Sequence, residues 1–250
     1  MFFEDFSPDN IGDFPAAWNT NGSGEIVNNS LFPGKWLSLK NYDNYVWSES
    51  KWNLQENYTI EFDVIFPEDG SGNFGFLEKP NADENIYVYN SKNAFWLQTR
   101  DNGLEYYIDN NGENTINSSN STEDNLFGSN KKIHFSCWIT GQRVRVYVMQ
   151  NKILDLPRAI QNSSTRYNTI ALRGNLLISN IRVAAGLGDT RSKLIKEGKL
   201  VSYGIYFDPN KDVLKPESYG SLKSIADVLK ENPQLRIKIV GHTDGDGKDD

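Results

Sequence analysis

Apolar and polar residues alternate along several segments of the first 186 positions. The clearest alternation covers Lys35–Leu39, Asn57–Phe66, Lys132–Thr140, Gln142–Gln150 and Leu176–Ala184. A period of two is typical of β-strands that bury one face. Gly141, between the third and fourth segments, predicts a tight hairpin, and the polar cluster Asp109–Asn125 predicts a surface loop. Several short strands without a helical period predict an all-β sandwich.

The pattern changes after Gly186. Asp189–Lys199 is rich in charged residues and predicts a short helical connector. A shift of this kind marks a domain boundary. We therefore divide the chain into a β-sandwich at residues 1–186, a helical linker at 187–200 and a third segment at 201–250.

The third segment has the pattern β-α-β. Ser202–Phe207 predicts a strand, and Leu235–Val240 predicts a second one. Between them, apolar residues spaced three and four apart predict an amphipathic helix, with Pro216 in its first turn and Asn232-Pro233 at its end. So short a segment cannot cover both faces of its sheet, and we expect it to be an incomplete folding unit.

Charge and hydropathy narrow the function. The formal net charge is −7 at pH 7 and the pI is about 5.0, which argues against nucleic-acid binding because such proteins present a basic face. No stretch approaches the ~18 apolar residues that a membrane-spanning helix needs. The sequence begins Met-Phe-Phe-Glu without a basic start or a long apolar run, so the export signal of a secreted protein would lie outside this chain.

Cysteine and histidine, two common metal ligands, are scarce in the sequence. Cys137 is the only cysteine, which excludes an intrachain disulfide and a cysteine-based zinc site. It lies in an apolar run and is expected to be a buried, inert thiol. The two histidines, His134 and His242, are far apart in the sequence. No metal site is therefore assigned from local spacing.

Two motifs in the third segment resemble the C-terminal domain of the OmpA family. They are Gly204–Asp208 and Ile239–Gly247, which contains Gly-His-Thr-Asp, on either side of the predicted helix. Residues 201–250 would then be the N-terminal half of an OmpA-like peptidoglycan-binding domain. Its resemblance implies a partial α+β (β-α-β) fold and a ligand, the diaminopimelate residue of peptidoglycan stem peptides.

The same resemblance implies which residues bind that ligand. Asp244 would hold its ammonium group through a charge-assisted hydrogen bond, and Thr243 would support the loop. Phe207 and Asp208 would line the pocket. The family completes this site with a later Asn-x-x-Leu-Ser-x-x-Arg-Ala helix, and the chain ends at Asp250 before such a motif. We therefore expect the full-length parent, in the outer membrane or periplasm, to bind the stem peptide, and this chain not to.

The first 186 residues resemble concanavalin-A-like and laminin-G-like domains. The resemblance rests on four segments, which are Glu4-Asp5-Phe6, Pro15 to Trp18, Tyr58–Asp63 and Ile178–Val183. This resemblance implies a lectin-like jelly-roll sandwich of unknown ligand. With the third segment, it gives a chain similar to Bacteroidetes-type OmpA family proteins that carry an N-terminal lectin-like domain.

The alternative function is a carbohydrate-binding module or a glycoside hydrolase of the laminarinase type. Those hydrolases place three carboxylates along one strand, and Glu61 and Asp63 match the first two. Phe66 and Pro67 stand where the third, the proton donor, should be. We therefore predict no catalytic residues, and expect Glu61 and Asp63 on the solvent side of their strand.

The six tryptophans divide into two groups. Those near turns are candidates for a platform on which a sugar stacks: Trp18, Trp47 and Trp52. Those within apolar alternation are expected in the core: Trp36, Trp96 and Trp138. No cofactor is predicted, apart from a candidate structural calcium near Glu4, Asp5 and Asn180, on first and last strands that pair in such sandwiches.

Overall fold

The computed structural model describes most of the chain. The described residues are 2–49, 52–78, 93–100, 103–110, 113–117, 127–149, 151–162, 164–185, 198–200, 202, 205–208, 211–215 and 218–241. The predicted linker, 187–200, therefore lies outside them except for its last three residues. No helix in the described part is both long and apolar enough to cross a membrane.

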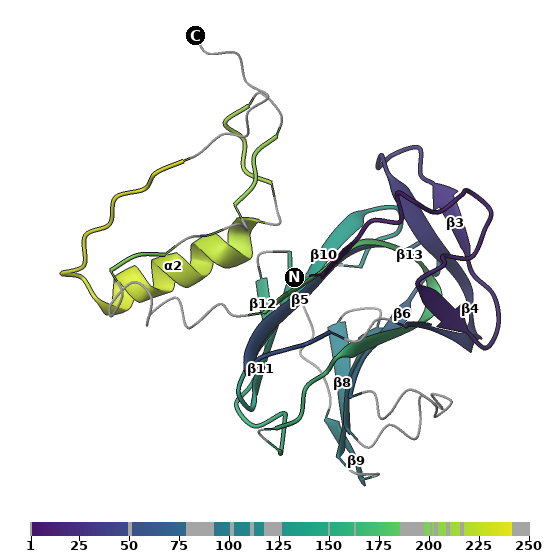
Figure 1. Cartoon of the computed structure of the whole chain (residues 1–250), viewed down its shortest axis with the longest axis horizontal. Coiled ribbons are helices and arrows are strands. Elements are labelled where there is room, and N and C mark those ends of the chain that lie inside the picture. The colour runs from purple at the N-terminus through teal and green to yellow at the C-terminus, as the bar shows by residue number, and fades with distance from the viewer. Residues whose placement is uncertain are drawn as a thin grey trace.

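Antiparallel strands form the first part of the molecule, which confirms the predicted all-β jelly-roll sandwich (Figure 1). Within the described residues they are β1 (Phe2–Glu4), β2 (Trp18–Thr20), β3 (Glu25–Asn28), β4 (Lys35–Ser48), β5 (Asn57–Ile65), β6 (Gly72–Leu77), β7 (Asn93–Arg100), β8 (Gly103–Asn110), β9 (Glu113–Asn117), β10 (Lys132–Thr140), β11 (Arg143–Val148), β12 (Asn151–Leu156) and β13 (Thr169–Ala185). Gly141, with φ of 56°, turns the chain from β10 into β11, as predicted.

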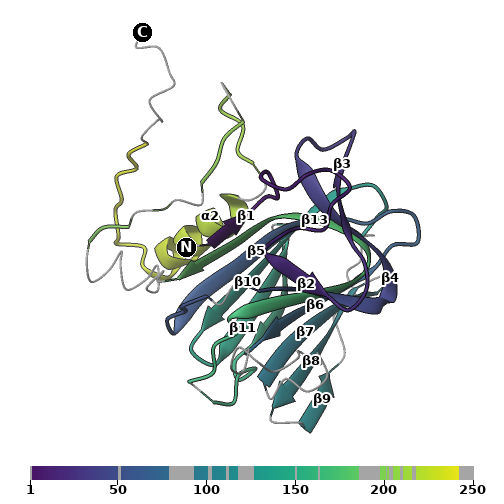
Figure 2. The same cartoon turned by 45° about the vertical axis from the view of Figure 1, so that its right-hand side comes forward.

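The strands follow the order β12-β11-β10-β5-β13-β6-β7-β8-β9, and β13 belongs to both layers. Its first half pairs with β6 and β4, and its second half with β5 and β1 (Figure 2). Register shifts at Leu172/Gly174 and Ser179/Arg182 bend the strand between the layers. Gly174 has φ of 136°, and a Cβ there would lie 2.3 Å from the Ser71 carbonyl oxygen, so the bend requires glycine.

Phenylalanine rings from both layers form the centre of the core. The Phe62 ring of β5 lies 4.9 Å from that of Phe74 on β6 and 5.2 Å from that of Phe135 on β10. Phe76 and Phe95 extend the contact to β7. Burial of rings this large supplies much of the stability of a sandwich. Cys137 lies in the same core with no exposed surface, and burial raises its thiol pKa, as expected of an inert cysteine.

The loop predicted at Asp109–Asn125 contains strand. β8 continues to Asn110, and β9 occupies Glu113–Asn117. The two strands pair with each other, and β8 also pairs with β7. Glu113–Asn117 has a single apolar residue, Ile116, so β9 lacks the alternation from which strands are predicted, and backbone hydrogen bonds to β8 hold it at the sheet edge instead.

The third segment contains one described helix, α2 (Tyr219–Glu231), which ends at Asn232 as predicted. The two predicted strands beside it are not formed in the described residues. Phe207 makes only an isolated bridge with Leu214. Leu235–Val240 is extended but has no strand beside it, and Ile239 is 84% exposed. An extended segment becomes a strand only when a neighbour satisfies its backbone groups.

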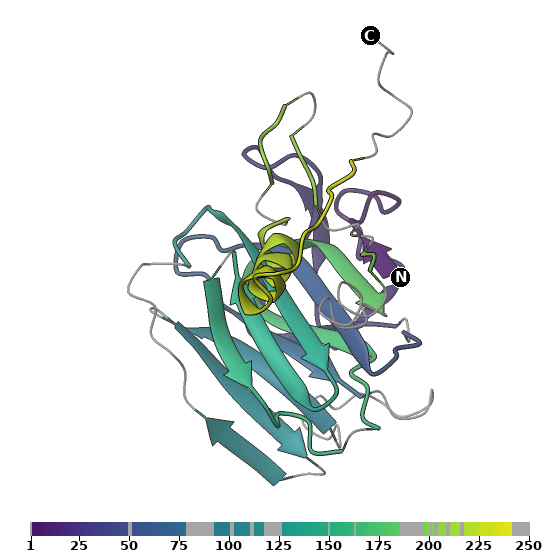
Figure 3. The same ribbon diagram turned by 90° about the vertical axis from the view of Figure 1, so that its left-hand side faces the viewer.

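Arg182 of β13 joins the sandwich to the third segment. Its guanidinium lies 5.5 Å from the centre of the Phe3 ring and 4.8 Å from that of Tyr206, whose hydroxyl accepts a hydrogen bond from Nη1. The hydroxyl of Ser218, just before α2, accepts a hydrogen bond from the Tyr206 backbone N–H at 2.7 Å. The same hydroxyl donates a hydrogen bond to the Tyr206 carbonyl at 2.9 Å. Figures 1 and 3 place α2 on the outer side of the layer that contains β10 and β11.

Candidate functional site

A second apolar cluster lies outside the core, on the outer face of the layer formed by β4, the first half of β13, β6, β7 and β8. Its buried members are Tyr45, Leu77, Ala94 and Ala171, and half-buried Trp47 and Trp96 pack against them. Side chains alternate between the two faces of a strand, and on these strands the opposite positions, such as Phe76 and Phe95, fill the core. The cluster is therefore a surface feature of this layer.

Strand register places the aromatic residues in one line. Trp47 on β4 lies opposite Ala171 on β13, which lies opposite Gly75 on β6. Gly75 is opposite Trp96 on β7, and Trp96 is opposite Tyr107 on β8. We call these five residues the aromatic row. It crosses five strands, and its two tryptophans lie 124 and 75 positions along the chain from Ala171, so only the register of the sheet brings them together.

The Trp96 ring lies over the glycine of the row. A Cβ built on Gly75 would lie 2.4 Å from Cη2 of Trp96, so the ring occupies the space above that residue. The Tyr45 ring contacts the Trp96 ring edge-on, with ring centres 6.1 Å apart and an interplanar angle of 72°. The indole therefore lies against the sheet and keeps part of its surface exposed.

A second line of side chains runs beside the aromatic row. Arg173 on β13 lies opposite Asn73 on β6, Asn73 opposite Gln98 on β7, and Gln98 opposite Glu105 on β8. We call these four residues the polar row. Each lies two positions along its strand from a member of the aromatic row, so both rows share one face, roughly 7 Å apart.

Hydrogen bonds hold the polar row in place. Arg173 Nη1 donates to the Tyr45 hydroxyl at 2.8 Å, and its guanidinium lies 5.1 Å from the centre of that ring. The Tyr107 hydroxyl lies 2.9 Å from both Gln98 Oε1 and Glu105 Oε2. Arg100 pairs with Glu105 at 2.8 Å, and this hydrogen bond holds the pKa of the Glu105 carboxyl below its usual value. The row thus presents fixed donors and acceptors beside an aromatic surface.

The structure places only one of the three predicted platform tryptophans on this face. Trp47 is in the aromatic row, whereas Trp18 and Trp52 are 4% and 8% exposed and pack in the core. Neither can offer a ring face to a sugar. Trp96 was expected in the core but lies on the outer face, because β7 is apolar on both sides and alternation cannot tell one side from the other.

The two other tryptophans predicted to be core residues also differ from each other. Trp36 is buried, as expected, and its Nε1 donates to the Phe32 carbonyl at 3.1 Å. Trp138 is half-buried on the outer face of β10, where its ring lies 5.3 Å from that of Tyr147. It belongs to the other layer of the sandwich.

The carboxylates of the glycosidase pattern do not form an accessible pair. Asp63 was expected on the solvent side, but it is 1% exposed. It lies 2.8 Å from His134 Nδ1 and accepts a hydrogen bond from Asn180 at 2.9 Å. Burial would raise its pKa, but the contacts with His134 and nearby Lys132 hold that pKa below its usual value. Phe66, at the position of the third carboxylate, is in the core.

The residues considered for calcium are engaged in other contacts. Glu4 accepts the Phe6 backbone N–H at 2.9 Å, and Asn180 donates to Asp63. In the part of the chain that the structure describes, no group of three or more His, Cys, Asp or Glu side chains is placed to hold a metal ion. Calcium near these strands stays a prediction.

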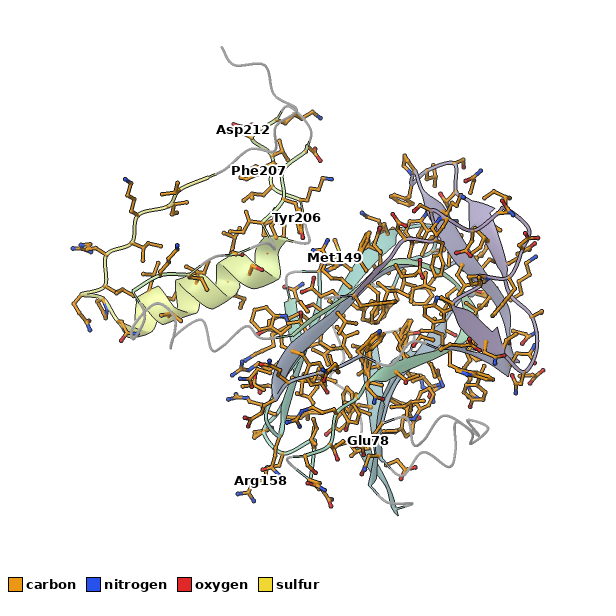
Figure 4. The ribbon with its side chains drawn as sticks, viewed as in Figure 1. Glu78, Met149, Arg158, Tyr206, Phe207 and Asp212 are labelled. Carbon is orange, nitrogen blue, oxygen red and sulfur yellow. The ribbon has the colours of Figure 1, made fainter. Side chains whose placement is uncertain are left out.

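The predicted peptidoglycan site is described only in part. Phe207, labelled in Figure 4, is 52% exposed. The Asp208 N–H donates to the Val213 carbonyl at 2.9 Å. Lys211 Nζ lies 3.8 Å from the Asp208 carboxylate. Thr243 and Asp244 lie outside the described residues, as does His242, so their arrangement stays a prediction.

Comparison with known proteins identifies the third segment. Residues 206–250 match the model of the OmpA family, which confirms the resemblance of these residues. Over 49 residues the chain is 41% identical to outer membrane porin F from Pseudomonas fluorescens, a match that covers 20% of this chain and 15% of the porin. The chain therefore spans a small part of the length of that relative.

The chain is also similar to solved structures over most of its length. The carbohydrate-binding module CBM66 from Bacillus subtilis is 16% identical, with a TM-score of 0.46, and the match covers 68% of this chain and 96% of the module. Domain 4 of the extracellular arabinanase AbnA from Geobacillus stearothermophilus, solved with arabinotriose, is 13% identical, with a TM-score of 0.47. That match covers 74% of this chain and 91% of the domain.

Proposed function

We propose that this is a non-catalytic protein of the bacterial cell envelope, in the outer membrane or periplasm, with two binding parts. The sandwich binds carbohydrate on the face that carries the aromatic and polar rows. The third segment belongs to a domain that attaches the parent protein to peptidoglycan.

The main support for carbohydrate binding by the sandwich is the aromatic row with the polar row beside it. Half-buried Trp47 and Trp96 give an apolar surface on which sugar C–H groups can stack, and this adds a favourable contact beyond simple burial. Hydroxyls of the sugar need donors and acceptors at the edge of that surface, and the polar row supplies both. Aromatic surface next to planar polar side chains is the usual composition of a small-ligand site.

Alanine substitution at Trp96 tests this part. Purified protein is titrated with a panel of soluble polysaccharides by isothermal calorimetry, and Trp96→Ala is expected to weaken the binding about tenfold or more. Trp138→Ala is the matched control, because Trp138 is also half-buried but lies on the other layer. Equal loss in both variants would mean that the aromatic row is not the site.

The match of residues 206–250 to the OmpA family supports the second part. In this proposal Asp244 binds the ammonium group of diaminopimelate, Thr243 supports its loop, and Phe207 and Asp208 line the pocket. A single charge-assisted hydrogen bond contributes only about 1.5–3 kcal/mol, less than the cost of immobilising the ligand. The arginine of the later family helix must therefore supply the rest.

Sedimentation with purified sacculi tests the second part. A parent protein extended through the arginine helix of the OmpA family is expected to sediment, and Asp244→Ala is expected to abolish this. The 250-residue chain is expected to stay in the supernatant. Undiminished sedimentation of the Asp244→Ala parent would show that the ligand is held elsewhere.

A further inference from the structure

We infer that the face takes a neutral polysaccharide chain, laid across the strands so that one chain contacts Trp47 and Trp96 together. This inference deepens the proposed carbohydrate binding and rests on it. It commits to an internal stretch of a linear glycan, and not to a single sugar or to a charged polymer.

The extent of the aromatic row indicates a ligand of several sugars. The row runs from β4 to β8, four strand-to-strand steps, or roughly 19 Å. A single sugar ring is no larger than one indole and can cover only one tryptophan. Ala171 and Gly75 lie between the tryptophans, so no large side chain of the row stands between them. A longer chain can therefore reach both rings.

The direction of the chain follows from how the side chains change along a strand. On β7 the outward positions run from Ala94 through Trp96 to Gln98 and exposed Arg100, so a chain parallel to the strand would leave the aromatic surface after one ring. Across the strands, the aromatic positions continue. The polar row runs in the same direction, so a chain laid across the strands would have hydrogen-bond donors and acceptors beside it on four strands.

The charges on this face indicate a neutral ligand. Arg100 and Glu105 pair at 2.8 Å, so neither offers an uncompensated charge. Arg173 lies over the Tyr45 ring and is bonded to its hydroxyl. An anionic polymer would have to compete with the Glu105 carboxylate for Arg100 and would be repelled by that carboxylate. A neutral glycan can accept hydrogen bonds from the two guanidinium groups without breaking the pair.

The test is a ladder of neutral linear oligosaccharides, from monosaccharide to hexasaccharide, of gluco-, xylo-, manno- and arabino- type. Binding to the full chain is measured by calorimetry and by ligand-observed NMR. For the series that binds, affinity is expected to rise with length until both tryptophans are covered. Trp47→Ala and Trp96→Ala are each expected to lower hexasaccharide affinity about tenfold, and Trp138→Ala to leave it unchanged.

Binding of a monosaccharide distinguishes the contributions of Trp47 and Trp96. A monosaccharide covers only one ring, so one of the two alanine variants should keep the monosaccharide affinity of the unmodified protein. If either alanine variant fails to fold, Trp→Leu at the same position keeps apolar volume without an aromatic face. Thermal melting of each variant establishes that it is folded before binding is compared.

Each contrary result has a distinct meaning. Binding of a monosaccharide as tightly as the hexasaccharide would overturn the inference and leave the proposed carbohydrate binding intact. Tighter binding of polygalacturonate or alginate than of any neutral polysaccharide would overturn the neutral ligand class. No binding of any glycan, neutral or anionic, would overturn the proposed function of the sandwich and this inference with it.

Discussion

The Trp96 ring owes its position to the residue beneath it. Gly75 has no side chain, and the six-membered ring of Trp96 fills the space where a Cβ would be. Any larger residue there must displace the indole or the strand, because the two cannot occupy the same volume. Gly75 is thus a positioning residue of the proposed site, although it offers a ligand no side chain.

We expect Gly75→Ala to weaken binding of the hexasaccharide while the sandwich stays folded. The added Cβ would lie 2.4 Å from Cη2 of Trp96, so the ring has to move out of its place in the row. Gly241→Ala is the control, because nothing lies within 4 Å of a Cβ there. Affinity is measured by calorimetry and the indole environment by fluorescence. Unchanged affinity in Gly75→Ala would mean that binding does not depend on the ring position.

At the scale of elements, charged side chains connect β11 and β12, the hairpin at one edge of the sheet. Asp155 of β12 accepts two hydrogen bonds from Arg143 of β11, at 2.7 and 2.8 Å, and one from Lys152 at 3.0 Å. The bond from Arg143 is the main reason that the pKa of Asp155 falls to about 2. Bidentate geometry of this kind makes a surface pair contribute more than a single contact does.

We expect Asp155→Asn to lower the free energy of unfolding by about 0.5–1 kcal/mol near neutral pH. The carboxylate has a lower pKa in the folded protein than in the unfolded chain, so its contribution is fully present above the unfolded value of about 4. It is lost as the pH falls towards about 2, where the folded carboxyl takes up its proton. Denaturant unfolding at several pH values measures this.

The control for that prediction is Glu25→Gln. Glu25 makes a single contact with Lys40, and both side chains are more exposed than Asp155. Loss of the Glu25–Lys40 contact should change the free energy of unfolding little at any pH. A difference between Asp155→Asn and the unmodified protein that stays constant from pH 7 to about 2 would show that the lowered pKa does not stabilise the fold.

Individual strands could be predicted where one face is apolar. On β5, Ile60, Phe62 and Val64 alternate with more polar residues, and the strand forms where expected. β9 was missed because Glu113–Asn117 has only one apolar residue. Its pairing with β8 depends on backbone groups, which every sequence possesses.

The candidate site could be predicted only in part for a related reason. Trp47 was singled out by its place near a turn, but Trp96 joins it through register across three strand boundaries. The sequence shows which face of a strand is apolar, and not which strands are neighbours. The four members of the polar row come from four strands, and no local motif connects them.

At the scale of the whole molecule, the sandwich and the third segment differ in how their backbones are satisfied. Every residue of β5 pairs with β10, and most pair also with β13. By contrast, the described backbone of Leu235–Val240 has no strand partner, and Ile239 and Val240 are 84% and 61% exposed. The contact of Arg182 with Tyr206 holds the beginning of the third segment, and not this part of it.

We therefore expect amide hydrogen exchange to divide the chain into two classes. Amides of Tyr58–Ile65 should exchange slowly, because they open only when the sandwich unfolds. Amides of Leu235–Val240 should exchange close to the rate of an unstructured peptide, since water already reaches most of them and no ladder protects them. Mass spectrometry of peptides from each region, in the 250-residue chain at neutral pH, measures both rates under one condition. Slow exchange throughout Leu235–Val240, comparable with that of β5, would contradict the prediction and show that this segment is paired in solution.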